Sequence, residues 1–220
     1  MEDADFKVKE WLSRRRSSVI ERKQFEKSII QNKPILWVMG PAGVGKGTQC
    51  AKLQARYGYT HLSSGELMRY EILEGSNRSQ LMLELMKSGK PVPNETVIDI
   101  IAQAMVALAK DSKGFVIDGF PLDEEQASAF EKEFGPPSLV FHLVCNGGIL
   151  RERLQERNNY DDTKDAVGNR MKMFSEFTKP VLAKYDAIKI NTDKGKDEVF
   201  HEIESVMIRK LGITKSVLAD

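Results

Sequence analysis

Residues 35–48 read ILWVMGPAGVGKGT, and this stretch decides the fold. Its first five residues, Ile35 to Met39, form a short apolar run that is typical of a buried parallel strand. The next nine, Gly40 to Thr48, fit the pattern G-x-x-x-x-G-K, in which glycines allow backbone N–H groups to point at an anion. A helix that opens near Lys46 would aim the positive end of its dipole at the same anion. The stretch therefore predicts a strand, a phosphate-binding loop and a helix.

Apolar runs and helical patterns alternate along the rest of the chain. Strand-like runs lie at 60–62, 115–117, 139–144 and 187–190, with helical patterns between them. The clearest helical pattern extends from Val97 to Leu108, where apolar residues recur three and four positions apart. Such alternation is typical of βαβ units. We therefore predict an α/β fold with a P-loop NTPase core, in which helices flank a five-stranded parallel sheet.

The composition limits the classes of protein that fit. The 220 residues include 33 Lys and Arg against 32 Asp and Glu, a net charge of +1, which favours neither a nucleic-acid partner nor a disordered acidic chain. No apolar run approaches the ~20 residues of a membrane span, and the acidic N-terminus is unlike a signal peptide. Cys50 and Cys145 lack metal-ligand spacing and lie beside apolar residues, so both are expected to be reduced, buried core thiols. We expect a cytoplasmic protein with no nucleic-acid or membrane partner.

The position of the threonine makes the loop pattern more specific. Thr48 follows Gly47 instead of the lysine, and the form G-x-x-G-x-G-K-G-T resembles the phosphate-binding loop of adenylate kinases. The resemblance continues in order through YGYTHLSSGELMR at 57–69, KPVP at 90–93 and FVIDGFP at 115–121. It covers roughly residues 34–212 and points to the short-lid, isoenzyme 1-like branch of the adenylate kinase family.

This resemblance implies a domain organisation. Residues 34–220 are expected to form the nucleoside-monophosphate (NMP) kinase domain, with a small helical NMP-binding insertion at 63–93 and a short lid at 158–166. Residues 1–33 are expected to form a charged, helical N-terminal extension. Within it, RRRSS at 14–18 is either a site for a basophilic kinase or a solvated charge run. A monomer is the family's default state.

The resemblance also implies two nucleotide sites, one for ATP with Mg²⁺ as cofactor and one for AMP. The implied ATP-binding residues are Gly43, Val44, Gly45, Lys46, Gly47, Thr48, Arg153 and Arg157. The implied AMP-binding residues are Ser64, Arg69, Lys90, Val92, Gly119, Gln126 and Arg170. The implied catalytic residues are Lys46, Asp118, Arg157 and Arg170. Phosphoryl transfer needs charge neutralisation on the transferring group, and Asp118 would hold the metal through its water shell.

Structural alternatives exist for several of these residues. The arginines could form surface salt bridges, Asp118 could cap the turn at Gly119, and Gln126 could be a solvated helix residue.

Two residues favour adenine as the base of the acceptor. Ser64 matches the threonine usual in adenylate kinases, where UMP and CMP kinases usually have alanine, and the amide of Gln126 can pair with the adenine edge.

Two segments depart from the family pattern. Leu122 stands where the family has an arginine after Asp-Gly-Phe-Pro, and it is followed by Asp123 and Glu124. Residues 157–162 read RNNYDD, a shortened lid that lacks the family's lid arginine. Loss of one donor to developing charge typically lowers a rate by ~10²–10³, so weak activity is expected.

The function expected from these residues is reversible transfer of the terminal phosphate of MgATP to AMP, which gives two ADP. Two alternatives stay open at the level of sequence. One is a catalytically impaired nucleotide-binding protein, which the loss of arginines would favour. The other is a kinase with a different acceptor, such as UMP or CMP.

Overall fold

The computed structural model describes residues 30–155 and 163–213. Most of the expected N-terminal extension at 1–33 therefore lies outside the described residues, as do Arg157 and the first five residues of the expected lid. None of the helices within the described ranges is long and apolar enough to cross a membrane.

Five strands form one parallel sheet, as predicted. The strands are β1 (Ile35–Met39), β2 (Thr60–Ser63), β3 (Phe115–Asp118), β4 (Leu139–Val144) and β5 (Ile188–Asn191). Their order across the sheet is β2-β3-β1-β4-β5, and every neighbouring pair is parallel. The α/β prediction is confirmed.

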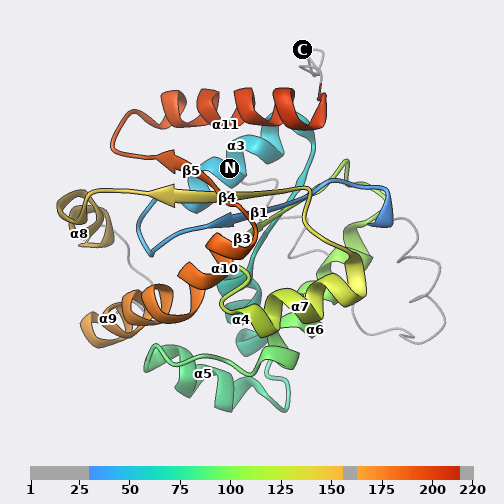
Figure 1. Ribbon diagram of the computed structural model, residues 1–220. Helices are drawn as coiled ribbons and strands as arrows, with labels where there is room; N and C mark the ends of the chain where they lie inside the picture. The colour runs from blue at the N-terminus through green and yellow to red at the C-terminus, as the bar shows by residue number, and fades with distance from the viewer. Residues whose placement is uncertain (1–29, 156–162, 214–220) are drawn as a thin grey trace.

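Helices cover both faces of this sheet (Figure 1). The described helices are α3 (Lys46–Tyr57), α4 (Ser64–Leu73), α5 (Ser79–Lys87), α6 (Asn94–Leu108), α7 (Glu124–Phe134), α8 (Gly147–Gln155), α9 (Lys164–Met173), the π-helix η1 (Phe174–Thr178), α10 (Lys179–Lys184) and α11 (Lys196–Leu211). α3 and α11 lie on one face, and α4, α6, α7 and α10 lie on the other. α5 lies farther from the sheet, beyond α4 and α6.

β1 is buried on both faces because helices cover both faces of the sheet. Its successive side chains point in opposite directions and so enter two different clusters. Leu36 and Val38 join the hydrophobic cluster under α3 and α11. Ile35, Trp37 and Met39 join the second cluster, which includes residues of α6, α7 and α10. This central position explains why the strand reads as a continuous apolar run rather than as an alternating one.

Trp37 is the centre of an aromatic group that connects the sheet to its surroundings. Its ring makes edge contacts with Phe120 at 5.9 Å, Phe130 at 5.6 Å and Tyr185 at 5.1 Å between centroids. Phe120 belongs to the loop after β3, and Phe130 belongs to α7. The packing of Trp37 therefore fixes the loop that follows β3 as well as the helix that it leads into.

The carboxyl ends of three strands meet at one edge of the sheet. Val38 of β1 is in register with Asp118 of β3, and Asp118 is in register with Ser63 of β2. β1 lies between β3 on one side and β4 on the other, so the connections that leave the strands diverge at its carboxyl end. Ligands of open α/β sheets bind at such a point.

The two cysteines differ in burial. Cys50 of α3 is fully buried, whereas Cys145 is only partly buried. The prediction of two buried core thiols is therefore wrong for Cys145. The reason is its place one residue beyond β4, where the chain has left the interior of the sheet.

We predict that Phe130→Ala lowers the free energy of unfolding by about 3–5 kcal/mol, because it leaves a cavity beside Trp37 in a fully buried aromatic group. Urea denaturation followed by circular dichroism measures this change. Leu81→Ala is the control, since Leu81 is 54% exposed and its loss should change stability by less than about 0.5 kcal/mol. Equal stabilities of the two variants would contradict the described packing.

Candidate functional site

A cavity of about 780 Å³ opens at the carboxyl edge of the sheet. The loop after β1, the start of α3, the start of α4 and the loop after β3 all contribute to its wall. Its cationic lining residues within the described ranges are Lys46, Arg69, Lys90, Arg153, Arg170, Lys194 and Lys196, against the acidic pair Glu66 and Asp118. A cavity with this charge suits a ligand that carries several negative charges.

The loop from Gly40 to Gly45 has the conformation that its glycines predict. Gly43 has φ 82° and Gly45 has φ 98°, in the left-handed region where a side chain would be strained. α3 begins directly afterwards at Lys46 and has no acidic residue in its first turn. The Nζ atom of Lys46 donates to the carbonyl oxygens of Gly40 and Pro41, both at 3.0 Å. Backbone amides, a helix N-terminus and a cation therefore meet at one place, as an anion site requires.

Asp118 is the last residue of β3 and lines the same cavity. It is 8% exposed, and its Oδ2 atom lies 3.6 Å from Nε2 of His61. A Cβ atom built on Gly47 would lie 3.6 Å from the same oxygen. The carboxylate is thus beside the first turn of α3, within the reach of a ligand bound on the loop.

Ser64 connects α4 to the end of β3. Its hydroxyl lies 3.1 Å from the carbonyl oxygens of both Asp118 and Gly119, to which it donates. Gly119 has φ 73°, and a Cβ there would come within 3.2 Å of the Ser64 hydroxyl. The glycine is therefore required both for backbone conformation and for this close approach.

Gln126 is buried, which excludes the solvated alternative for this residue. It is 2% exposed, its Oε1 accepts from the backbone N–H of Leu122, and its Nε2 donates to Oδ1 of Asn94, both at 2.8 Å. It also lines the cavity. Both ends of the amide are engaged, so pairing with a base would have to replace or share these bonds.

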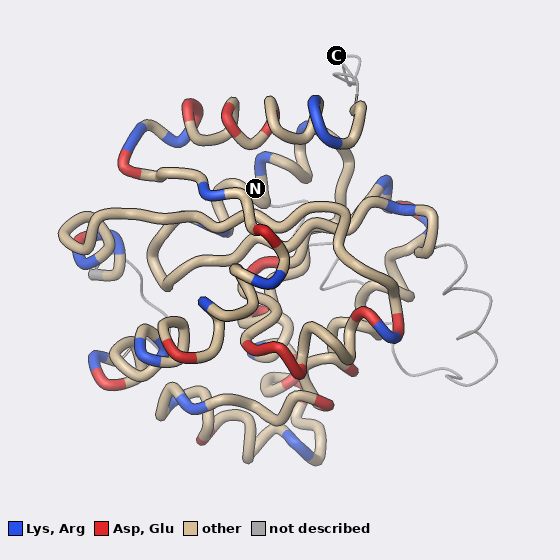
Figure 2. The backbone as a smooth tube through the Cα atoms, viewed as in Figure 1, with Lys and Arg blue, Asp and Glu red and all other residues tan. Residues whose placement is uncertain are grey.

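Two residues that hold Gln126 were not predicted from the sequence. Asp123 caps α7, since its Oδ1 accepts from the backbone N–H of Gln126 at 2.8 Å. Asn94, at the start of α6, reaches across to Gln126 and Glu125. The spacing Asp-x-x-Gln resembles a capping box and could have predicted the helix start, whereas the contact with Asn94 has no local signal. Figure 2 shows residues 123–125 as one continuous acidic segment at the start of α7.

Arg153 of α8 reaches from its helix to the phosphate-binding loop. Its guanidinium donates to the carbonyl oxygen of Thr192 at 3.0 Å and to that of Val44 at 3.5 Å. Its partners thus come from the loop after β1 and from the end of β5. These bonds place a cation beside the loop.

The other expected cations within the described residues line the same cavity. Arg69, Lys90 and Arg170 line it, and Arg170 donates to the carbonyl oxygen of Met86 at 3.4 Å. Val92 and Leu122 line the same region. The position of Arg157 lies outside the described residues.

The π-helix η1 follows α9 and holds the loop after β3 from the other side. Its last residue, Thr178, donates from Oγ1 to the carbonyl oxygen of Leu122 at 2.8 Å. The backbone of Leu122 is therefore fixed at both ends, by Gln126 and by Thr178. π-helices are rare and occur frequently at functional sites, which agrees with its place at the cavity.

A glycine-rich loop of this pattern at the carboxyl edge of a parallel sheet, in a cavity lined by several cations, is typical of the P-loop class of nucleotide-binding proteins. Residues 38–190 match the family model of adenylate kinase. Adenylate kinase isoenzyme 1 of Cyprinus carpio is 40% identical over 179 residues, which is 78% of this chain and 92% of the carp protein. Isoenzyme 1 of Sus scrofa is 37% identical over 182 residues (79% and 94%), and isoenzyme 5 of Homo sapiens is 37% identical over 177 residues (77% and 32%). The chain therefore belongs to the adenylate kinase family and is a nucleoside-monophosphate kinase.

We predict that Asp123→Ala lowers the free energy of unfolding by about 0.5–2 kcal/mol, because α7 loses its N-terminal cap. Thermal denaturation followed by circular dichroism measures the change. Asp123→Ser is the matched control, since a serine hydroxyl can accept the same hydrogen bond from Gln126. If Asp123→Ala and Asp123→Ser are equally stable, the cap does not have the assigned role.

Proposed function

We propose that the protein catalyses reversible transfer of the terminal phosphate of MgATP to AMP, giving two ADP. The observation that carries the proposal is the single cavity in which Lys46, Asp118 and Arg170 face the same space. Phosphoryl transfer requires that two nucleotides be aligned and that charge on the transferring group be neutralised, with little covalent work for the protein. A lysine, an arginine and a carboxylate able to hold magnesium provide these functions.

The donor side of the proposed site is the loop with α3 and Arg153. Residues 43–48 would hold the outer phosphates of ATP through backbone N–H groups and the Lys46 ammonium. Arg153 is held beside Val44 and Thr192, where its planar guanidinium can stack on the adenine. Arg157, four residues further along the chain, is proposed to contact the phosphates.

Magnesium fits this side because the ion keeps several waters, and the Asp118 carboxylate can accept hydrogen bonds from them. The carboxylate lies beside Gly47 at the cavity wall, so it can bind a water of the magnesium shell while the ion contacts the phosphates. When bound, the ion neutralises charge on the phosphate oxygens. Lys46 and the loop amides keep the phosphates oriented toward the acceptor.

The acceptor side is proposed to use Arg69 and Arg170 for the phosphate of AMP, and Ser64, Lys90, Val92, Gly119 and Gln126 around the rest of the nucleotide. The NMP-binding insertion at 63–93 would carry most of this side, and the lid at 158–166 would cover the transferring group.

An ion network attaches the insertion to the core. Arg78 contacts Glu71 of α4 and Asp99 of α6, both at 2.9 Å. The monomeric state and the cytoplasmic location stay predictions.

We predict that Lys46→Met lowers kcat/KM by at least ~10², because the variant loses a cation directed at the transferring phosphate. A coupled assay of ADP formation from ATP and AMP, at high protein concentration, measures it. Lys52→Met on the same helix is the control, since Lys52 pairs with Asp197 away from the cavity lining. Equal activities of the two variants would exclude a catalytic role for Lys46.

We predict that Leu122→Arg raises kcat/KM for AMP by about tenfold or more, because it restores a cation on the acceptor side of the cavity. Leu122→Met, which keeps an apolar side chain of similar volume, should leave kcat/KM within about threefold of the wild type. The same assay is run with AMP, UMP and CMP as acceptors. Turnover with UMP or CMP but not AMP would change the proposed acceptor. Tight MgATP binding with no turnover in either variant would instead indicate an impaired nucleotide-binding protein.

A further inference from the structure

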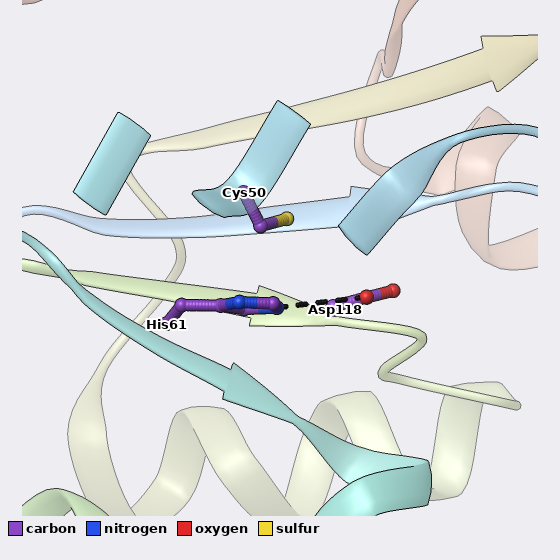
Figure 3. Close-up of side chains that lie close together, drawn as sticks. All are labelled: Cys50, His61 and Asp118. Atoms are coloured by element: carbon purple, nitrogen blue, oxygen red, sulfur yellow. Dashed lines mark ion pairs between the residues drawn. The ribbon is translucent and has the colours of Figure 1, made fainter. Parts of the chain in front are cut away.

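Three side chains with metal-binding atoms meet beneath the nucleotide cavity. Cys50 comes from α3, His61 from β2 and Asp118 from the end of β3. The cysteine sulfur, an imidazole nitrogen and a carboxylate oxygen all lie within 4.8 Å of one another. Figure 3 shows the His61 ring and the Asp118 carboxylate pointing toward each other, with Cys50 beside the line that joins them.

One buried polar atom of this cluster has no hydrogen-bond partner within the described part of the protein. Nε2 of His61 is buried and has no hydrogen-bond partner there. Its nearest acidic atom, Oδ2 of Asp118, is 3.6 Å away, which is too long for a hydrogen bond. A buried polar atom without a partner is costly, so a ligand that satisfied it would gain free energy.

The distances are close to those of a metal site. Zinc bonds to sulfur at ~2.3 Å and to nitrogen or oxygen at ~2.0–2.2 Å in tetrahedral geometry, which places neighbouring ligand atoms roughly 3.3–3.8 Å apart. The three atoms would therefore need to approach one another by about 1 Å, within the range of side-chain rotation. Thiolate and imidazole ligands favour zinc-like cations, whereas magnesium prefers oxygen ligands and keeps its waters.

We propose that Cys50, His61 and Asp118 form a site for a thiophilic divalent cation such as Zn²⁺, and that the cation inhibits the enzyme by withdrawing Asp118 from magnesium. Binding breaks the S–H bond of Cys50, releases its proton to solvent and forms a metal–sulfur bond. His61 contributes the lone pair of a neutral ring nitrogen, and Asp118 contributes a carboxylate oxygen. Asp118 also lines the nucleotide cavity, so the proposed cation and magnesium would need the same carboxylate.

Cys50 gives the cluster a preference for a soft cation over magnesium, because its ligand atom is sulfur. Burial raises the pKa of the Cys50 thiol well above its ordinary value, the charge of Asp118 raises it further, and Lys46 lowers it. The thiol is therefore neutral until a metal displaces the proton. A cation with strong affinity for sulfur can drive that exchange, whereas magnesium has little affinity for thiolate.

The test uses the full-length protein, freed of metals with a chelator and titrated with Co²⁺ alone as a spectroscopic probe. A thiolate-to-cobalt charge-transfer band is expected, and Zn²⁺ should bleach it by displacement. Cys50→Ser and His61→Gln should each weaken Co²⁺ binding by more than the ~10–100-fold that loss of an outer-shell partner causes. Cys145→Ser and His201→Gln, which alter the other free cysteine and an exposed histidine, should keep the band. Absence of the band, or its persistence in Cys50→Ser, would overturn the proposal.

A second measurement needs no variant and so does not depend on whether the variants fold. X-ray absorption at the zinc edge of the wild-type protein with one equivalent of Zn²⁺ should show one sulfur ligand and imidazole scattering. A shell of oxygen atoms alone would refute the site.

The inhibition rests on the function proposed above, whereas cobalt and zinc binding do not. In the coupled assay, Zn²⁺ should inhibit the wild type, a chelator should restore activity, and rising Mg²⁺ should weaken the inhibition. Fractional inhibition should be smaller in His61→Gln than in His201→Gln. If the metal binds but ADP formation is unaffected by it, the competition for Asp118 is disproved. If no ADP forms under any condition, the proposed transfer reaction fails, while the spectroscopic result on the site stands.

Discussion

The parallel pairing of β1 with β3 is the constraint on which the rest of the structure depends. It places Val38 beside Asp118, so the loop that begins at Gly40 and the carboxylate at the end of β3 are neighbours although nearly eighty residues separate them in sequence. The pairing is stable because β1 is buried on both faces, and the edge contacts of Trp37 with Phe120 and Phe130 connect this burial to the loop after β3. A change in register of one residue would move Asp118 away from α3 and exchange the faces to which Leu36 and Trp37 point.

Backbone carbonyl oxygens accept hydrogen bonds from three of the cationic side chains that line the cavity. They accept from Lys46 at Gly40 and Pro41, from Arg153 at Val44 and Thr192, and from Arg170 at Met86. Hydrogen bonds to these carbonyl oxygens help to fix the directions in which the three cationic side chains point. Under the proposed function, this prior positioning would reduce the reorganisation needed when a nucleotide binds. The acidic residue Asp118 differs from these cations, since its expected partner is a metal ion rather than a phosphate.

The sequence was sufficient for features that depend on local pattern. The strand at 35–39, the loop with its left-handed glycines and the helix from Lys46 follow from adjacent residues, and the structure has each of them where it was predicted. The environment of Gln126 was beyond such reasoning, because Asn94 is distant in the chain and comes close only after α6 packs against α7. Burial of Cys145 was predicted from its apolar neighbours, yet the point at which β4 ends decided its exposure. The meeting of Cys50 with His61 likewise depends on α3 crossing the sheet, which no spacing in the sequence encodes.

Two hydrogen bonds to the backbone of Leu122 make the conformation of the loop independent of the side chain at this position. Gln126 and Thr178 hold the peptide groups of this residue whatever its side chain is, while that side chain lines the cavity. A different side chain at this position would therefore change the charge at the cavity wall with little disturbance to the surrounding loop. Under the proposed function, divergence at position 122 would alter turnover or acceptor choice through a single side chain, while the backbone of the loop keeps its conformation.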